Sequence, residues 1–236
     1  MPRASARTIA LHLRRADPHL EEVIRRTGVR RPYRAPPGFG ALVRAIIYQQ
    51  ISGAAGSAIL RRVIEAGGAG GIPEPPWFEK APDALLRGAG VSPQKIRYLR
   101  DLAEEVVSGR LRFAELAVLG DDEVIEVLTR VRGIGRWTAQ MYLLFNLGRP
   151  DVLPTGDLGL RRAVQRLHGL RAPPAESTLL RIGRRWAPYR SHATFYLWRS
   201  LELDDSRADR SRAILLPVTG ASRRTATPRA RPRRSR

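Results

Sequence analysis

Apolar residues recur at the spacing of an α-helix through most of the chain, with polar residues between them. A clear example lies between Ser92 and Gly109, where the apolar positions share one helix face: Ile96, Leu99, Leu102, Ala103 and Val106. Ser92 followed by Pro93 is a favoured helix start, and Gly109 is suited to end the helix. No segment shows sustained alternation of apolar and polar residues, so the pattern predicts an all-α fold.

The same spacing predicts further helices over residues 9–15, 20–27, 39–66, 136–147, 157–168, 175–187 and 191–203. Gly53 and Gly56 are expected to bend or divide the long 39–66 segment. Asp121 or Asp122 is expected to cap a helix that leads into a turn at Gly133. A chain of 236 residues should form one compact unit or two closely packed lobes.

The charge balance adds a candidate partner. Lys and Arg number 42 against 22 Asp and Glu, which gives a formal net charge of +20. This balance favours a polyanionic partner, although a GC-rich genome would also enrich Arg without functional meaning. Residues 218–236 hold seven of these positive charges and no acid, so we expect a disordered basic tail, and +13 remains on residues 1–217.

The chain contains no cysteine, which excludes disulfides, zinc–thiolate sites, iron–sulfur clusters and cysteine nucleophiles. No apolar run reaches the roughly 18–20 residues that span a membrane, and the N-terminus lacks a secretory apolar region. We therefore expect a soluble cytoplasmic protein with no membrane partner.

A glycine-bearing turn, Gly133-Ile134-Gly135, lies between two helical patterns. It is either an ordinary helix connection or a hairpin whose backbone N–H groups grip a phosphate at the start of the next helix. In the second interpretation Ile134 packs inward, and the helix opens with Arg136 and Thr138. Backbone contacts of this kind would hold nucleic acid without reading its sequence.

Asp157 follows the turn residues Pro154 and Gly156 and precedes an apolar periodic segment. A helix N-cap is the ordinary role of such an Asp. The helix dipole and the N–H donors of that position also favour an ionised carboxylate, which could stabilise a developing positive charge.

Several aromatic residues lie near these motifs in the sequence: Trp137, Tyr142, Trp186, Tyr189 and Trp198. Each could belong to the core, or could stack on a base that has been pulled out of a duplex. Ile51 is likewise either a core residue or a wedge that fills the gap in the base stack.

Five blocks of the chain resemble the 3-methyladenine DNA glycosylase II family of the helix-hairpin-helix–GPD superfamily. They appear in the family's order within residues 39–198 and cover 42–52, 91–103, 133–139, 151–157 and 186–191. The resemblance implies two helical lobes with the active cleft between them. It also implies a glycosylase core over residues 39–217, on which residues 1–38 pack.

The resemblance further implies a monomeric base excision repair enzyme that flips alkylated purines, of the 3-methyladenine and 7-methylguanine type, out of double-stranded DNA. Asp157 matches the catalytic aspartate. The residues assigned to the base pocket are Trp137, Trp198, Tyr48 and Met141. Those assigned to DNA binding are Ile51, Gly133, Ile134, Gly135, Arg136 and Thr138.

Departures from the family's pattern narrow the chemistry. Bifunctional relatives carry a Schiff-base lysine where this chain has Trp137, so a simple hydrolase is expected, with neither metal nor other cofactor. Met141 replaces an aromatic pocket residue of some members, which leaves the lesion range open. About 38 residues precede the match, too few for the N-terminal β domain of some members. The alternatives are a non-catalytic DNA-binding protein, a glycosylase with lyase activity or one for oxidised or mismatched bases, and an RNA-binding protein acting through its tail.

Overall fold

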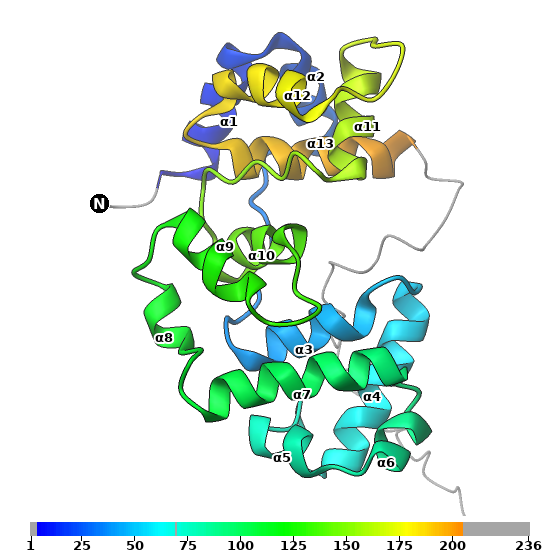
Figure 1. The fold of residues 1–236 in the computed structure, drawn as a ribbon. Coiled ribbons are helices and arrows are strands. Elements are labelled where there is room, and N and C mark those ends of the chain that lie inside the picture. Colours follow the sequence, from blue (N-terminus) through cyan, green and yellow to red (C-terminus); the bar gives the residue numbers. More distant parts are fainter. Residues whose placement is uncertain (1–3, 69, 205–236) are drawn as a thin grey trace, which may run out of the picture.

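The computed structural model describes residues 4–68 and 70–204, and every regular element in these ranges is a helix (Figure 1). The all-α prediction is therefore confirmed, while the predicted tail lies outside the described residues. The elements are α1 (Ala6–Ala16), α2 (Pro18–Thr27), α3 (Phe39–Tyr48), α4 (Gly53–Gly67), α5 (Pro75–Lys80), α6 (Asp83–Gly88), α7 (Pro93–Val107), α8 (Phe113–Leu116), α9 (Asp121–Thr129), α10 (Arg136–Tyr142), η1 (Leu143–Leu147), α11 (Leu158–Leu167), α12 (Glu176–Gly183), η2 (Arg184–Trp186) and α13 (Arg190–Asp204).

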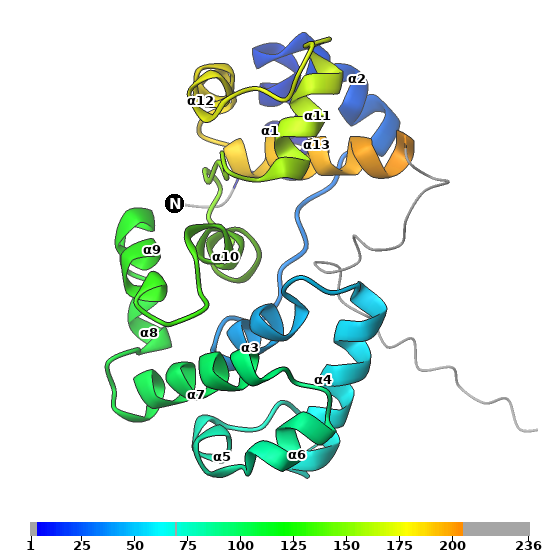
Figure 2. The same ribbon diagram turned by 45° about the vertical axis from the view of Figure 1, so that its right-hand side comes forward.

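The buried apolar side chains form two separate clusters. The first lies within residues 39–152, which we call the central body. The second joins α1 and α2 to α11–α13, and we call residues 4–27 and 153–203 the terminal body. Figures 1 and 2 show the two bodies one above the other, with α10 and α13 on the sides that face each other. The segment predicted to pack on the core thus shares a hydrophobic cluster with the last helices of the structure.

The long predicted helix 39–66 is divided, but the break is at residues 49–52, while Gly53 and Gly56, where it was expected, lie within α4. Gln50 has a left-handed φ of 56°, and Ser52 caps α4 by accepting a hydrogen bond from the Ala55 N–H. The Lys95 ammonium group donates to the carbonyls of Ile47 and Gln49 at 2.7 and 2.8 Å. This lysine satisfies carbonyl groups that the end of α3 leaves without helical partners.

Other boundaries also differ from the prediction, and the short helices α5, α6 and α8 were not predicted. Gly120, rather than Asp121 or Asp122, is the N-cap of α9, because Glu123 accepts a hydrogen bond from the Gly120 N–H at 2.6 Å. The 136–147 helix changes to a π-helix over η1. The 175–187 segment divides into α12 and the 3₁₀ helix η2.

Within the described ranges, we find no helix long and apolar enough to cross a membrane.

Candidate active site

Asp157 is the N-cap of α11, as predicted, and three N–H groups donate to its carboxylate. Its Oδ1 accepts from the Leu160 N–H at 2.5 Å and from the Trp198 indole at 2.9 Å. Its Oδ2 accepts from the Trp137 indole at 2.8 Å. Donors from α10, α11 and α13 therefore fix the carboxylate where the two bodies meet, and hydrogen bonds to a charged acceptor are among the stronger ones.

The local chain geometry explains this position. The Asp157 N–H donates to the Pro154 carbonyl, which closes a turn before the helix begins. A side chain at Gly159 would place its Cβ 3.1 Å from Asp157 Oδ1 and 3.4 Å from the Trp198 Nε1, so glycine leaves room for the indole. Trp198 also stacks on Phe145 of η1, with ring centroids 5.9 Å apart and planes 19° apart. Trp137 is less enclosed, with 41% of its surface exposed.

A cavity of about 760 Å³ lies beside Trp137. One wall is the connecting segment 33–38, and the others come from α3 and from α10 and η1; the lining includes Tyr48, Trp137, Thr138, Met141, Tyr142, Phe145 and Asn146. Asp157 and Trp198 do not line the cavity themselves. They reach its edge through the Trp137 hydrogen bond and the Phe145 stack.

Tyr48 and Met141 are both buried in this wall, with 2% and 5% of their surfaces exposed. The Arg44 guanidinium lies 4.8 Å from the centre of the Tyr48 ring, and a Cβ added at Gly56 would approach the ring to 2.8 Å. The Tyr48 hydroxyl hydrogen-bonds to Ser57 at 2.7 Å. Tyr48 is thus a packed wall of the cavity, since its ring is in close contact with its neighbours.

The cavity wall also contains the connecting segment 33–38, which the sequence did not single out, packed against the candidate Tyr142. The connecting segment is held by hydrogen bonds from the Ala35 N–H to the Phe145 carbonyl (2.9 Å) and from the Gly38 N–H to the Tyr142 hydroxyl (2.9 Å). Burial raises the pKa of Tyr142 to about 12, so this phenol stays neutral. Pro36 and Pro37 were a local sign of an extended segment, but nothing in the pattern placed it against η1.

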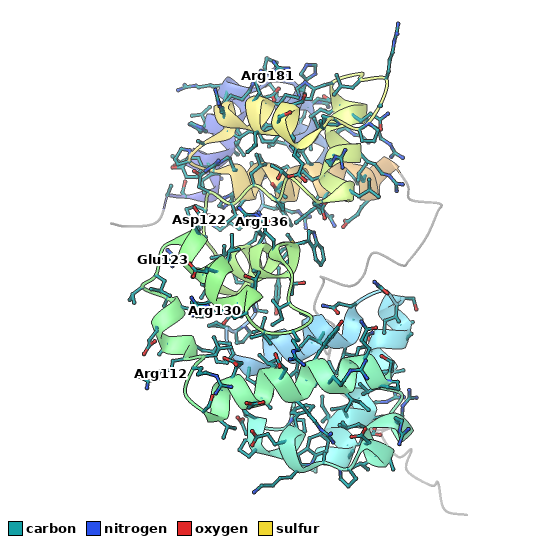
Figure 3. All side chains as sticks on the ribbon, in the orientation of Figure 1. Arg112, Asp122, Glu123, Arg130, Arg136 and Arg181 are labelled. Carbon is teal, nitrogen blue, oxygen red and sulfur yellow. The ribbon has the colours of Figure 1, made fainter. Side chains whose placement is uncertain are left out.

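The predicted hairpin adopts a backbone that only glycine fits at its first position. Gly133 has a φ of 83°, and a Cβ there would overlap the Tyr98 ring. Ile134 is buried in the central body, and Gly135 is the N-cap of α10. Arg136 is exposed and lies 3.8 Å from Asp122, a pair that Figure 3 shows where α9 and α10 meet.

The hairpin is joined to the turn that carries Ile51. The Gln49 side-chain amide donates to the Gly133 carbonyl at 2.7 Å, and Lys95 holds the same turn from α7. Ile51 itself is half-buried. Thr138, the third residue of α10, is buried and lines the cavity.

Two of the candidate aromatic residues lie away from this site. Trp186 is fully buried in the terminal body and donates to the buried carboxylate of Asp17 at 2.9 Å. Tyr189 contacts His12 edge-on, at 5.1 Å between ring centroids. For both residues, the core alternative describes the structure. No group of three or more His, Asp or Glu side chains suited to a metal ion occurs in residues 4–68 and 70–204.

A glycine hairpin, an Asp-capped helix and a cavity beside Trp137 together are typical of the class of helix-hairpin-helix DNA repair proteins. The chain belongs to the HhH-GPD superfamily of base excision DNA repair proteins, whose model matches residues 43–188. It is 34% identical over 199 residues to DNA-3-methyladenine glycosylase 1 of Schizosaccharomyces pombe, covering 83% of this chain and 87% of the relative.

Solved structures agree with this assignment. A DNA-3-methyladenine glycosidase from Bacillus halodurans superposes with a TM-score of 0.74 at 40% identity, covering 86% of this chain and 93% of the other. The 3-methyladenine DNA glycosylase of Schizosaccharomyces pombe in complex with abasic DNA has a TM-score of 0.77 at 33% identity, covering 84% and 98%.

Proposed function

We propose that the protein is a DNA glycosylase of base excision repair that hydrolyses the N-glycosidic bond of alkylated purines. The observation that carries the proposal is the Asp157 carboxylate, which two indoles and a backbone N–H hold at the edge of an aromatic-walled cavity. Membership of the HhH-GPD superfamily and similarity to 3-methyladenine glycosylases support the same substrate class.

The chemistry follows from the charge of the substrate. A purine alkylated at N3 or N7 is already cationic, so it leaves as a neutral base, and the sugar acquires oxocarbenium character. The fixed carboxylate of Asp157 stabilises that positive charge. Oδ1 already accepts two hydrogen bonds and Oδ2 accepts one. Oδ2 therefore has acceptor capacity left to orient the attacking water.

The flipped base enters the cavity beside Trp137, and Met141 forms part of its wall. Trp137, Trp198 and the Leu160 N–H together hold the Asp157 carboxylate, and we call this set of donors the carboxylate clamp. Trp198 donates to Oδ1, and Trp137 donates to Oδ2. Ile51 fills the gap left in the duplex. The backbone N–H groups at Gly133, Gly135 and the first turn of α10 hold a phosphate, with Arg136 beside them. The partner is double-stranded DNA that carries alkylated bases.

The same site favours a hydrolase over a lyase. Lyase chemistry needs an amine that attacks the sugar, and the chain has only two lysines, Lys80 and Lys95. Lys80 is exposed on α5, and Lys95 is bound to two carbonyl groups behind the hairpin. We expect the protein to act as a monomer. We also expect it to be located with the cell's DNA, which in a bacterium lies in the cytoplasm.

The test is release of methylated bases from alkylated duplex DNA, with the released bases identified by chromatography. Asp157→Asn keeps the size of the side chain and removes the charge, so base release should fall to background while DNA affinity changes little. Release by this variant at the rate of the unaltered protein would refute the role of Asp157. Binding without base release by the unaltered protein would instead support a non-catalytic DNA-binding protein.

A further inference from the structure

The two bodies carry equal numbers of basic residues but very different numbers of acids. Each has 14 Lys and Arg, whereas the central body has 13 Asp and Glu and the terminal body has six. Composition bias acts on the whole chain and would enrich arginine in both bodies alike. The excess positive charge of the terminal body therefore comes from a lack of acids, which such a bias does not explain.

Five of the six acids of the terminal body are already engaged. Asp17 is buried and Asp157 is held by its indoles. Glu22 and Glu202 pair with Arg25 and Arg199, and Glu176 accepts from Thr155. Many arginines of the terminal body consequently face solvent without compensation.

Part of the uncompensated charge lies on α12, η2 and α1. Arg181, Arg184 and Arg185 are exposed, and no carboxylate of the described residues lies within ion-pair distance of them. Positions three or four apart on a helix are neighbours, about 5–6 Å between their Cβ atoms. Arg15, also exposed, follows His12 by one turn, and His12 contacts the Ala187 carbonyl at 2.8 Å.

This face lies away from the candidate site. In Figures 1 and 2, α13 is on the side of the terminal body that faces α10, and α12 is on the opposite side. Figure 3 shows Arg181 at that outer end, whereas Arg136 lies where the two bodies meet. A duplex held at the hairpin would therefore leave this face open.

We propose that Arg15, Arg181, Arg184 and Arg185 form a second surface, the outer arginine face, that binds the phosphate backbone of another DNA duplex. Duplex DNA presents a dense array of negative charge, about one per 1.7 Å of helix axis, which exposed arginines bind without regard to sequence. The surface holds a second segment while the candidate site searches the first. It depends on the proposed function only in taking DNA as the partner.

The experiment uses the full chain saturated with a short unlabelled abasic duplex and titrated with a fluorescent undamaged duplex at 50 mM salt. The unaltered protein should bind a second duplex, with a stoichiometry of two by analytical ultracentrifugation. Arg181→Gln combined with Arg184→Gln and Arg185→Gln should weaken this second binding at least tenfold and lower its salt dependence by about 0.9 in log–log slope per lost phosphate contact.

The matched control neutralises three exposed arginines of the central body, each paired with a glutamate: Arg61, Arg110 and Arg112. It removes the same formal charge and should change second-duplex binding less than twofold. Equal losses in both variants, or no loss in the first, would overturn the proposal. Arginines at the end of α12 also complement the helix dipole, so a loss of stability without a loss of second-duplex binding would overturn it as well.

Base release from a short methylated duplex, measured at saturating protein, separates this proposal from the proposed function. The outer-face variant should release bases within twofold of the unaltered rate. If the unaltered protein releases no base, the proposed function fails while the second-duplex titration still decides the outer arginine face.

Discussion

Removing one indole donor should slow base release without removing the aromatic wall. Trp137→Phe keeps a flat ring beside the cavity but deletes the N–H group that lies 2.8 Å from Asp157 Oδ2. No other hydrogen bond to that oxygen exists among the described residues, whereas Oδ1 has two donors. The variant therefore tests how much the orientation of the carboxylate contributes to the reaction.

The magnitude follows from the hydrogen bond and its exposure. Hydrogen bonds to charged groups contribute about 1.5–3 kcal/mol. Because Trp137 is 41% exposed, water can replace part of this interaction, and we take the lower end, about 1.5 kcal/mol. Since about 1.4 kcal/mol corresponds to a factor of ten, the single-turnover rate should fall roughly tenfold.

The assay is single-turnover release of methylated bases at saturating protein, together with affinity for an abasic duplex. Trp137→Phe should lower the rate and leave the affinity within about twofold. Trp77→Phe is the matched control, because Trp77 packs edge-on against Phe78 in the central body, and its rate should not change. A Trp137→Phe rate within twofold of the unaltered protein, or a loss that disappears at saturation, would refute the positioning role.

Three further results are expected. Gly133→Ala should lower the free energy of unfolding by about 1–3 kcal/mol, because φ is 83° and the added Cβ would overlap Tyr98. Chemical denaturation measures this loss, and Gly135→Ala is the control, since Gly135 has a φ of −88° and open space around it. Equal losses in the two variants would contradict the reasoning. Lys95→Met should destabilise the 49–52 turn and weaken abasic-duplex binding, measured by anisotropy, while Lys80→Met should change neither value. Burial, with a smaller effect of Arg31, lowers the pKa of His192 from 6.5 to about 4. Between these two pH values the unfolded chain binds more protons than the folded chain. The contribution of His192 to the free energy of unfolding is therefore complete above pH 6.5 and falls as the pH drops toward 4. His192→Gln should reduce that loss in urea titrations at pH 7 and pH 4.5, and an unchanged pH dependence would show that folding does not lower the pKa of His192.

The features that depend on local sequence were predictable. Helical spacing gave most helices, and a turn followed by a periodic segment identified Asp157 as an N-cap. Gly53 and Gly56 predicted that the 39–66 segment is divided, but the break lies just before them, at residues 49–52. These signals lie within a few residues of what they describe.

The features that depend on distant contacts were not predictable from the pattern. Trp137 and Trp198 are 61 positions apart, yet both donate to one carboxylate. Trp186 is of the same residue type and belongs to the core instead, because Asp17 and the first helices enclose it. Residues 33–38, which form one wall of the cavity, show no helical or strand pattern of apolar residues. The Ala35 N–H of this segment donates to the Phe145 carbonyl of η1, which is 110 positions away.

The terminal body is built from both ends of the described chain, and this sets an order for folding during synthesis. Its core joins Leu13 and Leu20 of the first helices to Leu197 and Leu201 of α13. These contacts cannot form until the ribosome has released residues near 201, whereas the central body draws its core only from residues 39–152. The first helices, α1 and α2, therefore leave the ribosome long before the helices on which they pack. Contacts between residues so far apart in sequence form slowly compared with local ones. The carboxylate clamp joins α10 of the central body to α11 and α13, so it is assembled only in this last step.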